Sequence, residues 1–313
     1  MITPEKIKEW KRKAEQGDAD AQCNLGYSYD KGEGVEINPV EAVKWYRKSA
    51  EQGFAQSQCN LGNCYINGVG VIKDLDEAIK WYLMSAGQGN EMAQYNLGVS
   101  YAEGLGVDSD HEEAANWFRK SAEQGYAEAQ FKLGEYYRNG VGVSKNMTEA
   151  AKWYRMAAVQ GLASAQYNLG SCYFLGDGVV KDTAQAAEWY RRAGDNGDTQ
   201  ALYRLACFYA EGDGLIKDQT EAIKLYIKAS MLGEPNAQFA LAYIFYKGDG
   251  VVKNIIEAYA YFILSRAAEE LAEKALKIIE REMTPSQIEA GQKRSKELQK
   301  EIEAKIAAKG EKK

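Results

Sequence analysis

The residues that most often carry out chemistry are scarce in this chain of 313 residues. It has one histidine, His111, which directly follows Asp110. A Ser-His-Asp triad would have to use this histidine, and no pattern of nucleophile and base supports that role. We interpret His111 as a solvated residue in the first turn of a helix. We therefore expect no catalytic residue and no enzyme activity.

The five cysteines are the other reactive side chains. They lack the paired spacing of a disulfide framework and the Cys/His spacing of a zinc site. Two pairs of them are separated by whole multiples of 36 residues, which indicates shared positions in a repeat. We predict small buried or half-buried thiols, and we expect neither a metal nor a cofactor. The cysteines are Cys23, Cys59, Cys64, Cys172 and Cys207.

A Gly-x-Gly segment, such as Gly68-Val69-Gly70, could be mistaken for a phosphate-binding loop. It lacks the third glycine and the preceding strand of a dinucleotide fold, and the chain has no Walker loop. The segment recurs at a spacing of 36 residues. We therefore predict that each copy ends a helix and forms a turn.

The 36-residue spacing governs the whole chain. Seven units follow one another without insertion or deletion, and each holds a glycine, a leucine eight residues later and an alanine 25 residues later. A fixed period of this size predicts a solenoid of stacked units. We predict an N-terminal capping helix in residues 1–16, seven repeats in 17–268, and C-terminal capping helices with a frayed tail in 269–313. The glycines are Gly17, Gly53, Gly89, Gly125, Gly161, Gly197 and Gly233.

Each unit predicts two antiparallel helices. The first, helix A, covers about 19–30 in the first unit, and its Leu25-Gly26 pair indicates close helix packing. An Asn or Asp begins the second, helix B, with Glu or Gln three residues later, as in a capping box. Aromatic pairs such as Trp81-Tyr82 are expected in the core rather than in a ligand cage. The capping residues are Asn38, Asp74, Asp110, Asn146, Asp182, Asp218 and Asn254.

On helix A, the residues on the face opposite the core vary from repeat to repeat, whereas the residues that define the 36-residue pattern stay the same. Asparagine recurs there, and its amide could pair with an extended peptide backbone or simply bind the next repeat. Four other side chains break that pattern and are our candidates for specificity. The asparagines are Asn24, Asn60, Asn96 and Asn168, and the four others are Tyr27, Lys132, Arg204 and Tyr243.

The two ends differ from the repeats. Residues 3–16 are similar to a lone helix B and should cap the array. Residues 266–283 predict a charged helix, and Thr284-Pro285 predicts the start of another, which runs to about Lys309. This last helix either caps the array or binds a partner or a second copy. Residues 310–313 should fray.

Net charge and hydropathy limit the partners. The net charge is −6 with the two signs interspersed, which disfavours nucleic acid. No apolar run reaches 18 residues and the start has no apolar signal region, so we expect no membrane insertion, a cytoplasmic location and a monomer. A periplasmic or secreted location is the alternative, if a signal peptide was removed.

The third unit resembles the Sel-one-like repeat (SLR), with Ala93-Gln94-Tyr95-Asn96-Leu97-Gly98 and Gly104-Leu105-Gly106-Val107 followed by Glu113-Ala114 and Trp117-Phe118. The resemblance covers about 17–268. It implies an all-α, right-handed superhelix related to tetratricopeptide repeats, with helix A on the concave side. The ending 283–288 is similar to that of bacterial members.

The resemblance implies a non-enzymatic scaffold or adaptor that binds a protein or peptide on its concave face. The alternative is a secreted or periplasmic recognition protein on the same scaffold, either a host-contact factor or a toxin-neutralising immunity protein. Only the alternative requires an export signal.

Overall fold

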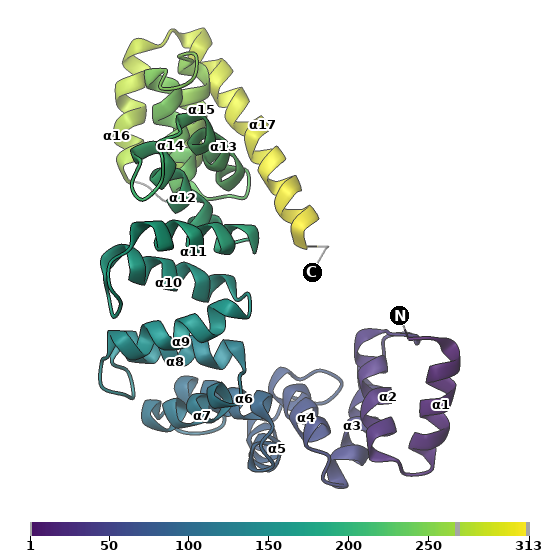
Figure 1. Ribbon diagram of the computed structural model, residues 1–313. Helices are drawn as coiled ribbons and strands as arrows, with labels where there is room; N and C mark the ends of the chain where they lie inside the picture. Colours follow the sequence, from purple (N-terminus) through teal and green to yellow (C-terminus); the bar gives the residue numbers. More distant parts are fainter. Residues whose placement is uncertain (1, 267–269, 311–313) are drawn as a thin grey trace. The chain divides into compact units, whose positions relative to one another are not determined.

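The computed structural model describes residues 2–266 and 270–310, and within these ranges the regular structure is entirely helical (Figure 1). Two compact units divide the chain, unit 1 at Met1–Ala157 and unit 2 at Ala158–Lys313. Unit 1 holds α1 to α8 and most of α9, and unit 2 holds α10 to α17. In unit 1 the helices are α1 Pro4–Glu15, α2 Ala19–Lys31, α3 Pro39–Glu51, α4 Ala55–Asn67, α5 Leu75–Gly87, α6 Glu91–Glu103, α7 His111–Glu123, α8 Ala127–Asn139 and α9 Met147–Val159.

Unit 2 continues the alternation of A and B helices and ends in two further helices. Its helices are α10 Ala163–Leu175, α11 Thr183–Asp195, α12 Thr199–Glu211, α13 Gln219–Ser230, α14 Pro235–Lys247, α15 Ile255–Ser265, α16 Glu270–Ile279, a 3₁₀ turn Glu280–Glu282, and α17 Pro285–Gly310. The repeated two-helix unit predicted from the sequence is therefore confirmed.

Helix A and helix B of a repeat approach each other closely at a glycine. A β-carbon on Gly98 in α6 would lie 2.5 Å from a ring carbon of Phe118 in α7, whose side chain is 1% exposed. That separation is well inside the normal contact distance of about 3.5–4.0 Å. The Leu-Gly pair of the sequence thus makes room for the aromatic ring of helix B. The same approach occurs at Gly26, Gly62, Gly134 and Gly170.

The turn between the two helices uses glycines with a positive φ. Gly68 ends α4 at φ +67° in the left-handed region that L side chains rarely adopt. Its backbone N–H donates to the carbonyl of Cys64, as expected of a helix C-cap. The predicted role of Gly-x-Gly as a turn is confirmed.

The start of helix B corrects one prediction. Asn38 accepts a hydrogen bond from the backbone N–H of Glu41 at 3.1 Å, as an N-cap should. The reciprocal half of the predicted capping box is wrong, because the backbone N–H of Asn38 donates instead to the carbonyl of Tyr29 at 2.8 Å. The Glu41 carboxylate binds Lys44 at 3.1 Å. The short turn brings the end of helix A close enough to replace the glutamate, and all seven repeats share this bond.

Buried polar side chains join successive repeats. Gln58 donates to the carbonyl of Ala50 at 3.1 Å and accepts from Gln88 of the next repeat at 2.8 Å. Ser85 donates to the carbonyl of Ala55 at 2.7 Å. Each buried amide is thereby satisfied, which aligns one repeat on the next. Equivalent bonds join Gln52 to Gln22, Gln124 to Gln94, and Asn196 to Gln166.

A helix outside the repeats packs against the first repeat, and another packs against the last. In unit 1, α1 packs on α2, with Thr3 as its N-cap. In unit 2, α17 packs along α15 and buries Leu298 and Ile302 (Figure 1). Thr284 and Gln287 form a true capping box at its start, with bonds of 2.9 and 3.3 Å. Of the tail predicted to fray, residues 311–313 lie outside the described residues.

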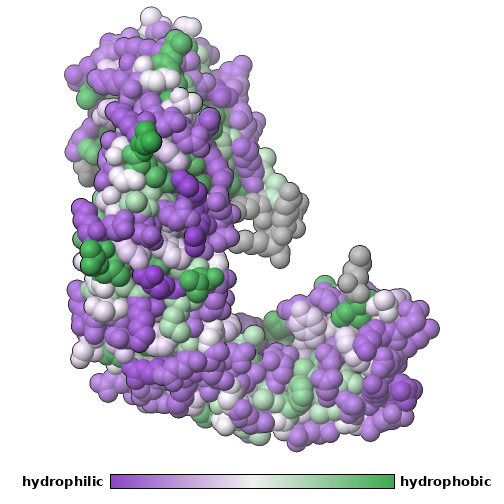
Figure 2. Space-filling model, viewed as in Figure 1, coloured by the Kyte–Doolittle hydropathy of each residue, from purple (hydrophilic) through white to green (hydrophobic). Residues whose placement is uncertain are grey.

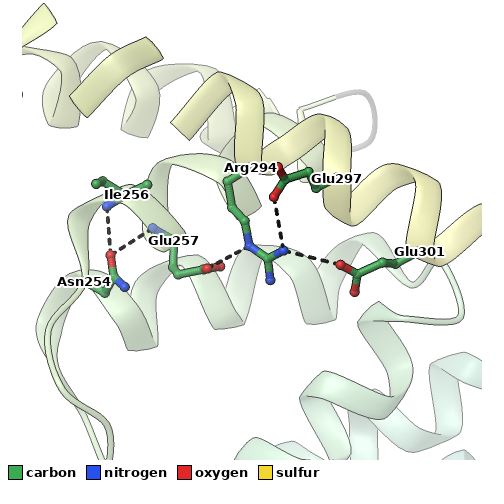
Figure 3. Close-up of polar contacts among 6 residues, drawn as sticks. All are labelled: Asn254, Ile256, Glu257, Arg294, Glu297 and Glu301. Atoms are coloured by element: carbon green, nitrogen blue, oxygen red, sulfur yellow. Dashed lines mark hydrogen bonds and ion pairs between the residues drawn. The ribbon is translucent and has the colours of Figure 1, made fainter. Parts of the chain in front are cut away.

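Arg294 forms a polar link between α17 and α15 (Figure 3). Its Nε lies 2.8 Å from Oε1 of Glu257, and its Nη1 lies 3.3 Å from Glu301 and 3.7 Å from Glu297. Glu257 belongs to the first turn of α15, which Asn254 caps. One arginine thus joins the capping helix to the last repeat.

Candidate binding site

A hollow of about 560 Å³ opens between the A helices α2 and α4 in unit 1. Asn24 and Tyr27 line it from α2, Asn60 and Asn67 line it from α4, and the ring of Tyr46 from α3 lies behind them. Three of the eight predicted binding residues, Asn24, Tyr27 and Asn60, therefore meet in one place. Tyr27 is 43% exposed, so the hollow leaves an aromatic face open to a ligand.

The amides of this hollow are partly engaged with one another. Asn24 donates to Asp20 at 3.1 Å, and Asn60 accepts from Gln56 at 3.1 Å. Asn67 donates to the carbonyl of Asn63 at 2.9 Å. These bonds leave the carbonyl oxygens of Asn24 and Asn67 and the amide hydrogens of Asn60 for a ligand, which are the groups that an extended backbone needs.

Charges flank the hollow. Asp30 and Lys31 form an ion pair of 2.8 Å, and this hydrogen bond raises the pKa of Lys31. Burial, and then the nearby Asp30 carboxylate, raises the pKa of the Tyr46 hydroxyl, which stays protonated at neutral pH. A ligand therefore meets neutral amides and one balanced pair of charges.

Asn96 has a different role from Asn24 and Asn60. Its amide donates to Oδ1 of Asn63 at 2.9 Å, and Tyr82 donates to the same oxygen at 2.7 Å. This is the repeat-to-repeat bond that the sequence left as an alternative. Lys132, on α8, pairs with Glu135 at 3.1 Å. Both residues lie in unit 1 but do not line the hollow.

The other predicted residues belong to unit 2. Asn168 is half-buried on α10. Arg204 on α12 is exposed. Burial is the largest single influence on its pKa and lowers it, but a hydrogen bond to Tyr167 and the charge interactions with the nearby tyrosines together outweigh burial and raise the pKa. Tyr243 on α14 is 45% exposed and lines a separate apolar hollow. The predicted residues thus do not form one site within either unit.

Four further residues line the hollow but were not among the predicted binding residues: Asp30, Lys31, Asn63 and Asn67. The recurrence of Asn at positions that face a neighbouring A helix was the available signal. It also missed the glutamines that join repeats, although Gln recurs at the position of Gln58 in six of the seven units.

The residues suited to chemistry are not gathered. His111 is exposed at the start of α7, with Nδ1 3.3 Å from the hydroxyl of Tyr136. All five cysteines are free, and four are buried. Within residues 2–266 and 270–310 no cluster of three His, Cys, Asp or Glu could hold a metal ion. None of the helices described there is long and apolar enough to cross a membrane.

Figure 2 shows a mainly hydrophilic face on which hydrophobic residues form small, separate patches.

Two solved structures are similar over most of the chain. The first is c5321, described as a protective antigen present in uropathogenic Escherichia coli strains displaying an SLR fold, with 32% identity over 96% of this chain and 72% of that chain and a TM-score of 0.69. The second is a Sel1 repeat protein from Oxalobacter formigenes, with 34% identity over 88% of this chain and 80% of that chain and a TM-score of 0.68.

A search of curated proteins gave no match. The Sel1 repeat family, whose members are generally protein-interaction scaffolds, matches in seven consecutive segments. The segments are 19–54, 55–90, 91–126, 127–162, 163–198, 199–234 and 235–270. This chain belongs to the Sel1 repeat family and is a helical solenoid of seven repeats.

Proposed function

We propose that this chain is a non-enzymatic adaptor that binds a polypeptide on the exposed face of its A helices. The observation that carries the proposal is the hollow between α2 and α4, where Asn24, Asn60 and Asn67 offer donors and acceptors beside the open ring of Tyr27. An extended backbone repeats a donor and an acceptor along its length, so an amide-lined hollow suits it better than it suits an apolar ligand.

A double variant, Asn24→Ala with Asn60→Ala, tests the proposal. Each lost hydrogen bond to a ligand contributes about 0.5–1.5 kcal/mol, so together they should weaken binding roughly 5- to 150-fold. Folding should change little, because both side chains face the hollow. Partners captured from the native cell with the wild-type chain would be identified by mass spectrometry and then titrated against each variant.

Lys152→Glu is the matched control, since Lys152 lies on the B helix α9 with its side chain 61% exposed. Its ion pair with Glu149 contributes little to stability, because both side chains lie at the surface. A partner that binds the asparagine variant as tightly as wild type but loses affinity for Lys152→Glu would refute the A-helix proposal.

A second candidate is a recognition protein outside the cytoplasm. It is favoured by the 32% identity to a protein described as a protective antigen of uropathogenic Escherichia coli. The five free cysteines favour a reducing compartment instead, and we propose the cytoplasm. Fractionation of native cells with an antibody to this chain distinguishes the two, because only the second places the protein outside the cytoplasm.

A further inference from the structure

A second hollow, of about 230 Å³, lies in unit 2 where the array meets its C-terminal cap. Tyr243 of α14 and Phe262 of α15 form one wall, and Ile278 and Ile279 of α16 form the other. Tyr243 is 45% exposed and Ile278 is 56% exposed. Its volume is below the 300–1,000 Å³ usual for drug-sized ligands, which suits it to a single side chain.

The aromatic wall is tightly packed. The rings of Tyr243 and Phe262 meet edge to face with centroids 5.5 Å apart, and Phe239 packs against both at 5.2 and 5.7 Å. Edge-to-face pairs of this kind have a preferred geometry and resist rearrangement. The wall is therefore preformed for another apolar group.

The mouth of the hollow carries positive charge. Lys247 lines it, and the ammonium groups of Lys247 and Lys253 lie 5.3 and 5.2 Å from the ring centre of Tyr246. The hydroxyl of Tyr246 donates to Glu282 at 2.7 Å, so the nearby carboxylate is engaged by a tyrosine. Two ammonium groups stand against the single negative charge of Glu282, and this excess of positive charge favours a ligand with its own carboxylate.

The hollow corresponds in sequence register to the amide-lined hollow of unit 1. Tyr243 and Lys247 stand six repeats after Tyr27 and Lys31, and Phe262 stands six repeats after Tyr46. The facing helix decides the difference, because α4 supplies asparagines whereas α16 supplies alanine and isoleucine. Lys31 and Lys247 thus occupy the same position of the repeat, but Lys31 lies beside polar asparagines and Lys247 lies beside apolar side chains.

We propose that the hollow between α14 and α16 takes one phenylalanine-sized side chain of an acidic polypeptide, with Lys247 contacting an adjacent carboxylate. This rests on the proposed function and adds the chemistry of one anchor residue. Buried aromatic anchors commonly carry most of the affinity at such interfaces, while exposed charges add selectivity.

The test uses 3-phenylpropionate, which joins a phenylalanine ring to a carboxylate. The full-length protein would be labelled with ¹³C at isoleucine δ-methyl groups and titrated by NMR. We expect saturable shifts at Ile278 and Ile279, with a dissociation constant on the order of millimolar for so small a ligand. Ile72, which is 88% exposed in unit 1, reports non-specific contact and should not shift.

Three variants sharpen the test. Ala275→Leu fills the hollow and should abolish the shifts. Lys247→Glu should weaken the binding of 3-phenylpropionate about three- to fivefold, as expected for the loss of an exposed charge contact. The affinity for the uncharged 3-phenylpropanamide should be the same in Lys247→Glu as in wild type. Lys31→Glu is the matched control and should leave the binding of 3-phenylpropionate unchanged. Circular dichroism checks that each variant is folded.

Shifts at Ile278 and Ile279 no larger than those at Ile72 would overturn the proposal. So would equal weakening by Lys247→Glu and Lys31→Glu. Loss of 3-phenylpropionate binding by Ala275→Leu supports the anchor whether or not Asn24→Ala with Asn60→Ala affects the captured partner. The two proposals therefore fail independently.

Discussion

Replacing Gly98 by alanine tests the close approach between helix A and helix B. The new β-carbon would lie 2.5 Å from Cδ1 and 2.6 Å from Cε1 of Phe118. Phe118 is 1% exposed, and the rings of Tyr95 and Tyr136 pack against it with centroids 5.7 and 5.3 Å away. The ring has no open space into which it can move.

Two effects of opposite sign determine how much Gly98→Ala changes the free energy of unfolding. Alanine inside a helix is favoured over glycine by up to about 1 kcal/mol. Overpacking a filled core costs about 1–3 kcal/mol, and the separation here must grow by roughly 1 Å to reach normal contact. We expect the overlap to dominate and the free energy of unfolding to fall by about 1–2 kcal/mol.

Gly87→Ala is the matched control. Gly87 is the last residue of α5, and nothing lies within 4 Å of a β-carbon built there. This variant should gain up to about 1 kcal/mol from helix propensity alone. The two glycine-to-alanine changes should thus shift the guanidinium midpoint, followed by circular dichroism, in opposite directions.

A double-mutant cycle identifies the contact responsible. Phe118→Leu removes the ring, so Gly98→Ala should cost less in that background than in wild type. A rise in midpoint for Gly98→Ala alone, comparable to that of Gly87→Ala, would refute the packing argument. An equal cost in both backgrounds would show that Phe118 is not the obstacle.

Three further predictions concern the caps and the thiols. Asp182→Ala removes the side chain that accepts from the backbone N–H of Gln185 at 3.0 Å and should lower stability by about 0.5–2 kcal/mol; an unchanged urea midpoint would contradict this. Arg294→Ala should speed hydrogen exchange in α17 more than in α10, because it removes the 2.8 Å contact with Glu257; equal exchange would show that apolar packing alone holds α17. All five cysteines should react with a thiol reagent in denaturant without reductant. In the native protein Cys59 should react slowly, because burial raises its pKa to about 12 and leaves little thiolate at pH 8. Fewer than five reactive thiols in denaturant, or fast labelling of Cys59 in the native protein, would contradict the structure.

Local features of the sequence predicted the helices well. Leu25 and Ala42 recur at fixed positions, and both are almost fully buried. The cap at Asp182 and the turn at Gly68 also follow from residue types that act within a few positions of themselves. The partner of the Asn38 backbone N–H could not be predicted in this way, because it lies on the preceding helix.

The candidate sites were predictable only in part. The asparagine pattern pointed to Asn24 and Asn60, which the structure brings together, but the same pattern included Asn96, whose amide binds another repeat. Side chains at equivalent positions differ in role because their neighbours differ. Sequence periodicity gives the position of a residue on its helix, not the group that faces it.

The sequence by itself determined the repeat, the two helices of each unit, their caps and their buried faces, because these depend on short-range spacing and residue type. Only the tertiary structure decided how far each A helix stands from the next, which amides remain available, and how α16 and α17 close the array. The apolar hollow at Tyr243 illustrates the difference, since its opposite wall comes from Ile278 and Ile279 in a helix outside the repeat pattern. Contacts between such separate elements follow from helix packing geometry, which periodicity along one helix does not specify.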